Sequence, residues 1–160
     1  LGARATASSA LAALGELGIT SSTVAARRFG GPGSVVAAAS RLGVTIEQVL
    51  WSDAEAVDRA ASSADLVIST LPASAADPLA ERLRVREGQI LLDVVYSPRD
   101  TALRRAFENA GGVVAEGTDM LVFQAGAQVQ LMTGRSPDTG VMREALEEEL
   151  EGRSREGTAL

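Results

Sequence analysis

The first residues of the chain have the spacing of a dinucleotide-binding loop. Gly2, Arg4 and Ala7 align with the pattern Gly-x-Gly-x-x-Gly/Ala. In that pattern the first glycine permits a tight turn, and the second lets the backbone approach a pyrophosphate that lies at a helix N-terminus. Because Arg4 stands at the second glycine position, the loop by itself fits an ordinary helix start on the surface equally well.

Two adjacent arginines end the next β-prone stretch of the chain. Arg27 and Arg28 stand where NAD-binding folds carry an Asp or Glu, about 20 residues after the loop, and no acidic residue is nearby. Two guanidinium groups can hold a 2′-phosphate through bidentate hydrogen bonds. A solvated basic pair on the surface is the alternative. The position favours NADP over NAD, provided that a dinucleotide binds.

A short apolar strand is expected over residues 65–70. At its end the chain reads Ser69, Thr70, Leu71 and Pro72, two hydroxyl residues followed by a leucine and a proline. Ligands of parallel sheets bind at the carboxyl ends of the strands, where a loop of this kind can lie flat against a nicotinamide ribose. Tyr96, the only tyrosine, leaves another strand at the same edge, so we expect its hydroxyl to face a cleft rather than the core.

Gln124 lies in an apolar helix expected over residues 120–132. An inward glutamine needs hydrogen-bond partners, and a hydroxylated substrate supplies them. A glutamine on the solvent face of that helix fits the pattern as well.

Several residue types that carry chemistry are missing from the 160 residues. There is no cysteine or histidine, and all 15 basic residues are arginine. These absences exclude disulfides, thiolate nucleophiles, imidazole bases and lysine Schiff bases, and we expect no metal site. The net charge of −6 argues against nucleic acid and anionic membrane surfaces as partners. No apolar run approaches the roughly 20 residues of a membrane helix, so we expect a soluble, cytoplasmic domain.

The pattern of apolar residues predicts strands that alternate with helices. The expected strands are 22–26, 44–51, 65–70, 89–96 and 113–115. The expected helices are an Ala/Leu-rich one ending at residue 17, and 35–42, 53–64, 77–83, 101–110, 120–132 and 141–150. This alternation is typical of βαβ units, so we predict a doubly wound, mostly parallel α/β sheet of Rossmann type with helices on both faces. No strand precedes the glycine loop, so the first strand is expected to be truncated and the chain to be a fragment.

Two segments make the chain resemble the cofactor domain of NADP-dependent shikimate dehydrogenases. They read Asp-Val-Val-Tyr-Ser-Pro-Arg-Asp-Thr at 93–101 and Gly-Thr-Asp-Met-Leu-Val-Phe-Gln-Ala at 117–125. The resemblance runs to about residue 146, which implies a dinucleotide-binding domain over 1–146 and an acidic helix end with a flexible tail over 147–160. It departs at the loop, where the family has Gly-Ala-Gly-Gly. It departs again at Ala26-Arg27-Arg28, where the family has Asn-Arg-Thr.

The resemblance implies a role for each candidate site residue. The pyrophosphate would lie on Gly2, Ala3, Arg4, Ala5 and Thr6, and the 2′-phosphate on Arg27 and Arg28. The nicotinamide half would contact Ser69, Thr70, Leu71, Pro72, Val94, Gly117 and Met120. Tyr96 and Gln124 would contact shikimate.

The reaction implied is the reversible, NADPH-dependent reduction of 3-dehydroshikimate to shikimate, in the biosynthesis of chorismate and aromatic amino acids. In the family a Lys–Asp pair in an N-terminal substrate domain moves the proton. That domain is missing here, so we expect no catalytic residue in this chain and no activity from it alone. A homodimer stays open. The alternatives are a quinate/shikimate-type dehydrogenase of related specificity and a non-catalytic NADP-binding module with a degenerate glycine loop.

Overall fold

Short strands and helices alternate along the first part of the chain, as the apolar pattern predicts. The computed structural model describes the backbone of residues 1–157 and the side chains of residues 1–152. It divides into two units, Leu1–Val114 and Ala115–Leu160. Among the described residues, no helix has the length and apolar character needed to cross a membrane.

The first unit holds most of the secondary structure. Its helices are α1 (Ala5–Glu16), α2 (Val35–Leu42), α3 (Ala54–Ser63), α4 (Asp77–Ala80) and α5 (Ala102–Asn109). Its strands are β1 (Ser21–Ala26), β2 (Thr45–Leu50), β3 (Leu66–Ser69) and β4 (Ile90–Asp93), and β5 (Val113–Ala115) closes it.

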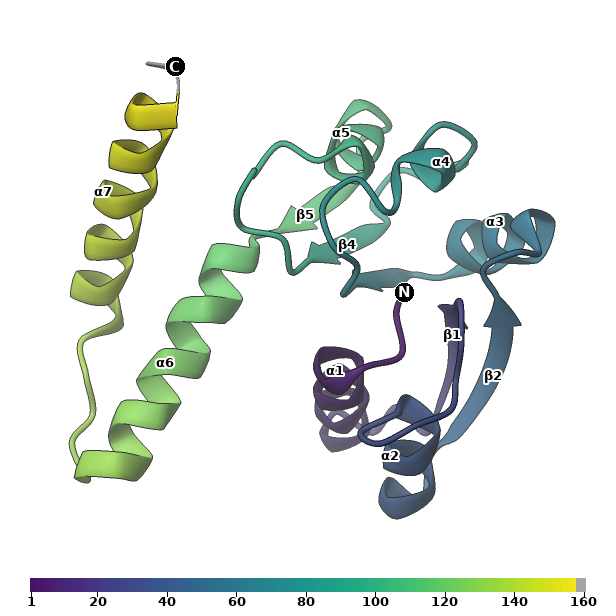
Figure 1. Ribbon diagram of the computed structural model, residues 1–160, viewed down its shortest axis with the longest axis horizontal. Coiled ribbons are helices and arrows are strands. Elements are labelled where there is room, and N and C mark those ends of the chain that lie inside the picture. Colours follow the sequence, from purple (N-terminus) through teal and green to yellow (C-terminus); the bar gives the residue numbers. More distant parts are fainter. Residues whose placement is uncertain (158–160) are drawn as a thin grey trace. The chain divides into compact units, whose positions relative to one another are not determined.

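The strands form two separate sheets, of order β1-β2 and β3-β4-β5 (Figure 1). β1 pairs with β2 in parallel, with Ser21 opposite Thr45, and β3 pairs with β4 in parallel, with Leu66 opposite Ile90. The predicted parallel α/β class is therefore confirmed. The first two residues lie between β1 and β3, because Gly2 N–H donates to the carbonyl of Ala25 at 2.8 Å and the Leu1 carbonyl accepts from Thr70 N–H at 2.9 Å.

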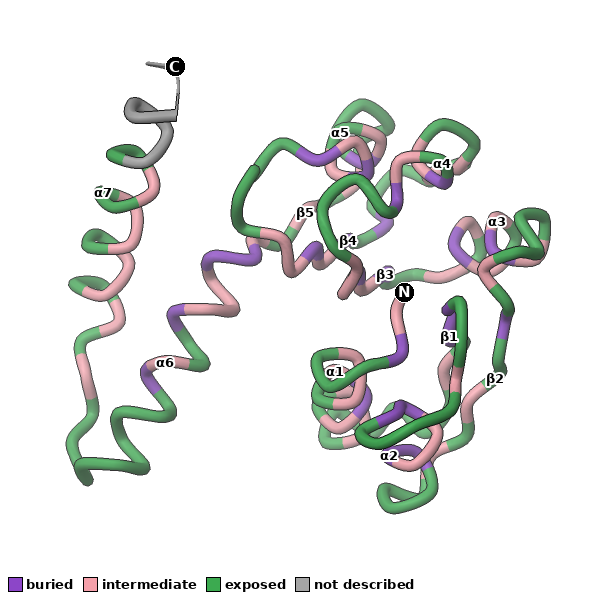
Figure 2. The backbone as a smooth tube through the Cα atoms, viewed as in Figure 1, coloured by how far each residue is buried: buried purple, intermediate pink, exposed green. Residues whose placement is uncertain are grey.

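Helices cover both faces of β1 and β2, because alternate strand residues point to opposite faces. On one face Val24 and Ala26 pack with Leu11 of α1 and Val35 of α2. On the other face Ala25 of β1 packs with residues of α3 and α4, among them Val57, Ala61 and Leu79. Figure 2 shows these buried positions recurring along the strands and helices. The second half of β1, Val24 to Ala26, is therefore buried between two helical layers.

α5 closes the core around β3 and β4. Leu103 and Phe107 of this helix are almost fully buried against Val67 of β3 and Leu91 of β4. Thr101 begins the helix, since its hydroxyl accepts from Arg104 N–H at 3.1 Å and donates to Asp93 at 2.9 Å.

Strand β4 is shorter than the predicted strand 89–96. It ends at Asp93, whose carboxylate accepts the Thr101 hydroxyl and also the Val95 N–H at 3.3 Å. These bonds turn the backbone away from the ladder. Tyr96 therefore lies in the loop after the strand.

The second unit contains α6 (Gly117–Thr133) and α7 (Thr139–Gly157). Arg143 of α7 forms an ion pair with Asp119 of α6 and lies 6.0 Å from the centre of the Phe123 ring. The predicted domain end at residue 146 falls inside α7, whereas the chain divides after Val114. The tail expected to be flexible is helical as far as residue 157, and residues 158–160 lie outside the described residues.

Candidate functional site

A cavity of about 600 Å³ lies at the carboxyl ends of β1, β2 and β3. The segments that follow these strands, together with the loop before α1, form its walls. The lining residues are Gly2, Ala3, Arg4, Ala26, Arg27, Arg28, Gly30, Trp51, Thr70, Leu71, Pro72 and Ala75. This is the edge at which ligands of parallel α/β sheets bind.

Gly2 is a position that only glycine fits. Its φ is +99°, and a Cβ built on it would lie 2.3 Å from the Thr70 hydroxyl oxygen. That hydroxyl is held in place because it donates to the Leu1 carbonyl at 2.9 Å. On the other side of the loop, the Ala3 carbonyl accepts from Val35 N–H at 3.2 Å. The turn before α1 is therefore tied to β3 and to α2.

Arg4 stands at the start of α1 in an extended conformation, and no side chain caps the helix there. The first N–H groups of a helix have no partner within it and attract anions. Ala5 and Thr6, in this first turn, are exposed and do not line the cavity.

Three arginines contribute to the cavity and give it its charge. Arg4 comes from the loop before α1, and Arg27 and Arg28 directly follow β1. No carboxylate is among the lining residues of this cavity. An anion with several oxygens is the ligand that such a wall favours, since guanidinium groups bind phosphate in bidentate fashion.

The end of β3 contributes three of its four predicted residues. Thr70, Leu71 and Pro72 line the cavity. Ser69 is buried instead, in a separate small pocket that it shares with Asp93 and Thr101. Its carbonyl accepts from the N–H of Val94 at 3.0 Å, so both residues belong to the β3–β4 ladder.

Trp51 is a lining residue that we did not predict. It directly follows β2, and its N–H donates to the Ala26 carbonyl at 2.9 Å, which holds it beside the end of β1. The signal was present in the sequence, because an aromatic residue ends a predicted strand at the edge where ligands bind. The indole adds a flat aromatic wall to the apolar residues of the cavity, among them Leu71 and Pro72.

Besides Ala5, Thr6, Ser69 and Val94, four more predicted site residues do not line the cavity. Tyr96 is 43% exposed and belongs to the first unit, in the loop after β4. Gly117, Met120 and Gln124 belong to α6 in the second unit, where Gly117 is buried and Gln124 is exposed. Their roles stay predictions. No cluster of three metal-binding side chains occurs among the residues that the structure describes.

Comparison with known proteins identifies the relatives of this chain. The family model of the shikimate 5′-dehydrogenase C-terminal domain matches residues 117–147. The crystal structure of Mycobacterium tuberculosis shikimate dehydrogenase is similar over 89% of this chain and 53% of that chain, at 35% identity and a TM-score of 0.77. The chain is related to the C-terminal domain of shikimate dehydrogenases.

Two further shikimate dehydrogenases agree. The Mycobacterium fortuitum shikimate 5-dehydrogenase is 39% identical, with a TM-score of 0.73 over 88% of this chain and 51% of that one. The shikimate dehydrogenase (NADP(+)) of Methanothermobacter thermautotrophicus is 33% identical over 97 residues, 58% of this chain and 34% of that protein. The chain thus spans at most about half the length of these shikimate dehydrogenases, and the resemblance predicted from residues 93–101 and 117–125 is confirmed.

Proposed function

We propose that this chain is the NADP-binding part of a shikimate dehydrogenase. The observation that carries the proposal is the cavity at the carboxyl ends of β1–β3, where three arginines and a glycine-only turn meet. The similarity to shikimate dehydrogenases is the basis for the proposed reaction. The name of the Methanothermobacter relative, shikimate dehydrogenase (NADP(+)), supports NADP as the proposed cofactor.

The residues of the cavity fit a dinucleotide phosphate. Gly2 has no side chain and lies close to Thr70. A pyrophosphate can therefore lie directly against the backbone of the loop and the N-terminus of α1. Arg27 and Arg28 would hold the 2′-phosphate, and the Trp51 ring offers a surface on which an adenine can stack. The absence of an acidic residue from the lining leaves no partner of the kind that prefers the 2′-hydroxyl of NAD.

The reaction that we propose for the whole enzyme is the reversible reduction of 3-dehydroshikimate. When bound, NADPH supplies the hydride. The resemblance to shikimate dehydrogenases implies that a Lys–Asp pair of the family's substrate domain would move the proton, and this chain contains no lysine. The residues of the cavity would orient the cofactor. The resemblance supports a contact with the substrate for Tyr96 and, separately, for Gln124.

A fluorescence titration with NADPH and NADH tests the cofactor. Trp51 is the only tryptophan and lines the cavity, so energy transfer from its indole to a reduced nicotinamide reports binding directly. We expect NADPH to bind at least roughly tenfold more tightly than NADH, because each charge-assisted hydrogen bond to the 2′-phosphate contributes about 1.5–3 kcal/mol. Equal affinities in a folded chain would contradict the assignment of Arg27 and Arg28.

Matched arginine variants locate the site. Arg27→Ala and Arg28→Ala should each weaken NADPH roughly tenfold and leave NADH nearly unchanged. Arg41→Ala, on α2 and outside the lining of the cavity, removes the same charge and should leave both affinities unchanged. A uniform loss in all three variants would mean that only the overall charge matters.

A non-catalytic NADP-binding module is the second candidate, and Arg4 is the observation that favours it. A side chain replaces the second glycine, at the point where a backbone usually approaches the pyrophosphate. Arg4→Gly separates the two. A large gain in NADPH affinity would indicate a degenerate loop, whereas a loss would show that Arg4 is itself a phosphate ligand.

A further inference from the structure

Residues 94–100, here called the Tyr96 loop, join the end of β4 to the start of α5. Asp93 ends the strand and Thr101 is the residue before the first turn of the helix. These two residues are more than nine-tenths buried, whereas residues 96–100 between them are exposed. Burial therefore fixes the two ends of the Tyr96 loop and not the residues at its tip.

The two buried side chains bond to each other. The Thr101 hydroxyl donates to one oxygen of the Asp93 carboxylate at 2.9 Å, and the other oxygen accepts from Val95 N–H at 3.3 Å. The same hydroxyl accepts from Arg104 N–H at 3.1 Å. A hydroxyl group has one hydrogen to donate, so its bond to Asp93 fixes its direction. A bond to a carboxylate is also roughly twice as strong as a bond between neutral groups.

A second pair of residues holds the far end of the Tyr96 loop. The guanidinium of Arg105 on α5 donates to the Asp100 carbonyl at 3.1 Å and pairs with the Asp100 carboxylate at 2.8 Å. Both side chains of this pair are more than half exposed, and exposed ion pairs contribute little to stability. The buried bond between Asp93 and Thr101 is therefore the stronger of the two.

The bond between Asp93 and Thr101 also lies next to the cavity proposed for the cofactor. Both residues line a small pocket together with Ser69 and Pro72. Pro72 lines the arginine-lined cavity as well, so the segment after β3 borders both. The base of the Tyr96 loop is thereby held at the edge of the sheet where the cofactor would bind.

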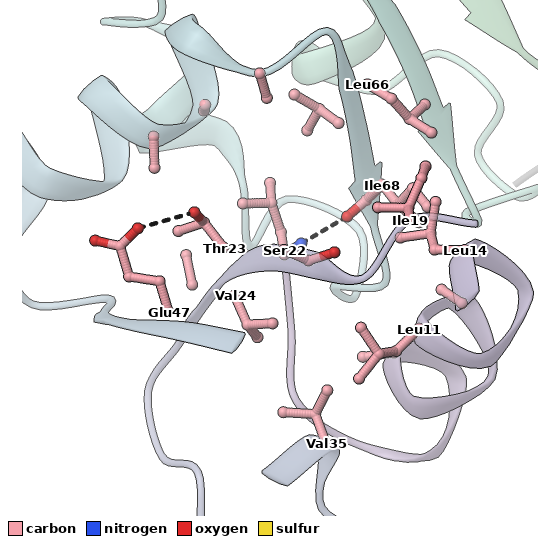
Figure 3. A pocket seen from close by; sticks show the side chains of 18 of the residues that line it. Leu11, Leu14, Ile19, Ser22, Thr23, Val24, Val35, Glu47, Leu66 and Ile68 are labelled. Atoms are coloured by element: carbon pink, nitrogen blue, oxygen red, sulfur yellow. Dashed lines mark hydrogen bonds between the residues drawn. The ribbon is translucent and has the colours of Figure 1, made fainter. Parts of the chain in front are cut away.

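Strand β3 supports this base, because it is bonded along both of its edges. On one edge the Ser69 carbonyl accepts from Val94 N–H at 3.0 Å. On the other edge the Ile68 carbonyl accepts from the Leu1 nitrogen at 2.6 Å (Figure 3). Val94, the first residue of the Tyr96 loop, is thus still bonded to the sheet, and the loop leaves the sheet only after it.

We propose that Asp93 and Thr101 are positioning residues, whose hydrogen bond holds the Tyr96 loop closed and places the Tyr96 phenol at the carboxyl end of β4. The inference rests on the proposed function, in which Tyr96 contacts the substrate. Asp93 and Thr101 act through the loop and do not themselves contact the substrate. A loop that is ordered before the substrate binds saves the cost of ordering it on binding.

The test uses the single tyrosine of the chain, because the signals of a ring-labelled tyrosine then report on this loop alone. Thr101→Val keeps the shape of the side chain and removes the hydroxyl. Its Tyr96 ring signals should move toward those of the urea-unfolded chain, and exchange of the Val95 amide should become about tenfold faster or more. Thr101→Ser keeps the hydroxyl and should restore both to nearly the values of the unmodified chain.

Asp53→Ala is the matched control, because Asp53 caps α3 as Thr101 caps α5, by accepting from Ala56 N–H at 3.0 Å. It should lower the urea midpoint to a similar extent and leave the Tyr96 ring signals and Val95 exchange unchanged. Asp93→Asn decides the matter if Thr101→Val does not fold. An amide has one acceptor oxygen in place of two, so it keeps the bond from Val95 or the bond from Thr101, and the ring signals should shift in the same direction.

Shikimate, added in the presence of NADPH, separates this inference from the proposed function. It should shift the Tyr96 ring signals of the unmodified chain, and Thr101→Val should weaken this binding by roughly fivefold or more, with rescue by Thr101→Ser. The inference is overturned if Thr101→Val leaves the ring signals and Val95 exchange unchanged, if Asp53→Ala alters them equally, or if Thr101→Val binds shikimate as tightly as the unmodified chain. Ring signals that ignore shikimate, while the Thr101 variants move the loop as expected, would support the positioning and contradict the proposed contact between Tyr96 and the substrate.

Discussion

At the scale of single residues, the first two positions of the chain carry the heaviest constraints. Gly2 combines a positive φ with a close approach to Thr70, and Leu1 presents a buried amine to Ile68. Both constraints act beside the cavity at the carboxyl ends of the strands, which Gly2 and Thr70 line. The effect of a substitution of Gly2, or of a change in the charge of the Leu1 amine, on the free energy of unfolding can therefore be estimated from the local contacts.

We expect Gly2→Ala to lower the free energy of unfolding by about 3 kcal/mol or more. The added Cβ would meet the Thr70 hydroxyl oxygen at 2.3 Å, in addition to the cost of a positive φ. Gly18→Ala is the matched control, because Gly18 has φ +83° with no atom within 4 Å of its added Cβ. It should cost only about 1–2 kcal/mol. Urea unfolding measures both, and equal costs would show that the contact with Thr70 relaxes freely.

The Leu1 amine predicts a pH dependence of stability. Its pKa is lowered to about 6, so between pH 6 and 8 the unfolded chain binds more protons than the folded chain. Stability should therefore rise with pH across this window, by about 2–3 kcal/mol in total, and this contribution should level off below pH 6 and above pH 8.

Acetylation of the N-terminus provides the control for this pH dependence. The chain has no histidine or cysteine, whose ordinary pKa values lie in or near the same window. Urea midpoints at pH 5.5, 7.0 and 8.5 should rise in the free chain and stay level in the acetylated one. A slope that survives acetylation would contradict the assignment of the effect to the Leu1 amine.

At the scale of elements, a single buried glutamine joins the end of α3 to the start of β4. The side-chain amide of Gln89 donates to the carbonyls of Ala61 and Ala64 at 2.7 and 2.6 Å, and its oxygen accepts from Arg86 N–H at 3.2 Å. The last carbonyls of a helix have no partner within it, and here a side chain from another element supplies one. Gln89 thereby sets the position at which β4 begins.

We expect Gln89→Leu to lower the free energy of unfolding by about 2–3 kcal/mol, because it removes the side-chain donor to the Ala61 carbonyl and one of two donors to the Ala64 carbonyl. Gln128→Leu makes the same chemical change at an exposed position of α6 and should alter stability by less than about 0.5 kcal/mol. Chemical denaturation of the two variants checks the difference. A small effect at Gln89 would mean that the hydrogen bonds of Arg86 to the same helix end suffice.

At the scale of the whole molecule, the chain resembles one part of a longer enzyme. It carries the arginine-lined cavity, but all of its basic residues are arginine and it has no histidine. We therefore expect a pure sample of these residues to show no shikimate-dependent reduction of NADP, even where NADPH binds. A coupled absorbance assay at 340 nm would detect it, and turnover above the background of an Arg27→Ala, Arg28→Ala double variant would contradict the proposed division of labour.

The order of strands and helices was predictable from the sequence, because it depends on short-range patterns. Apolar runs, glycine stops and capping residues act within one or two turns of backbone, and most predicted elements, such as 35–42 and 101–110, match the structure closely. Arg27 and Arg28 were predictable as ligand-facing residues for a related reason. Parallel strands bring their carboxyl ends to one edge, so position along the sequence predicts position in space.

Long-range contacts decided what the sequence left open. Trp51 lines the cavity because its N–H donates to the carbonyl of Ala26, 25 residues earlier in the chain. Ser69 does not line the cavity, because it pairs with β4 and its carbonyl accepts from Val94 N–H. Strand β4 ends at Asp93, where the carboxylate of this residue accepts a hydrogen bond from the Thr101 hydroxyl, eight residues later in the chain. Such bonds form only when the fold brings distant residues together. For that reason composition and spacing determined the class of the fold and the chemistry of its arginines, whereas tertiary structure alone decided the close approach of Gly2 to Thr70 and the walls of the cavity.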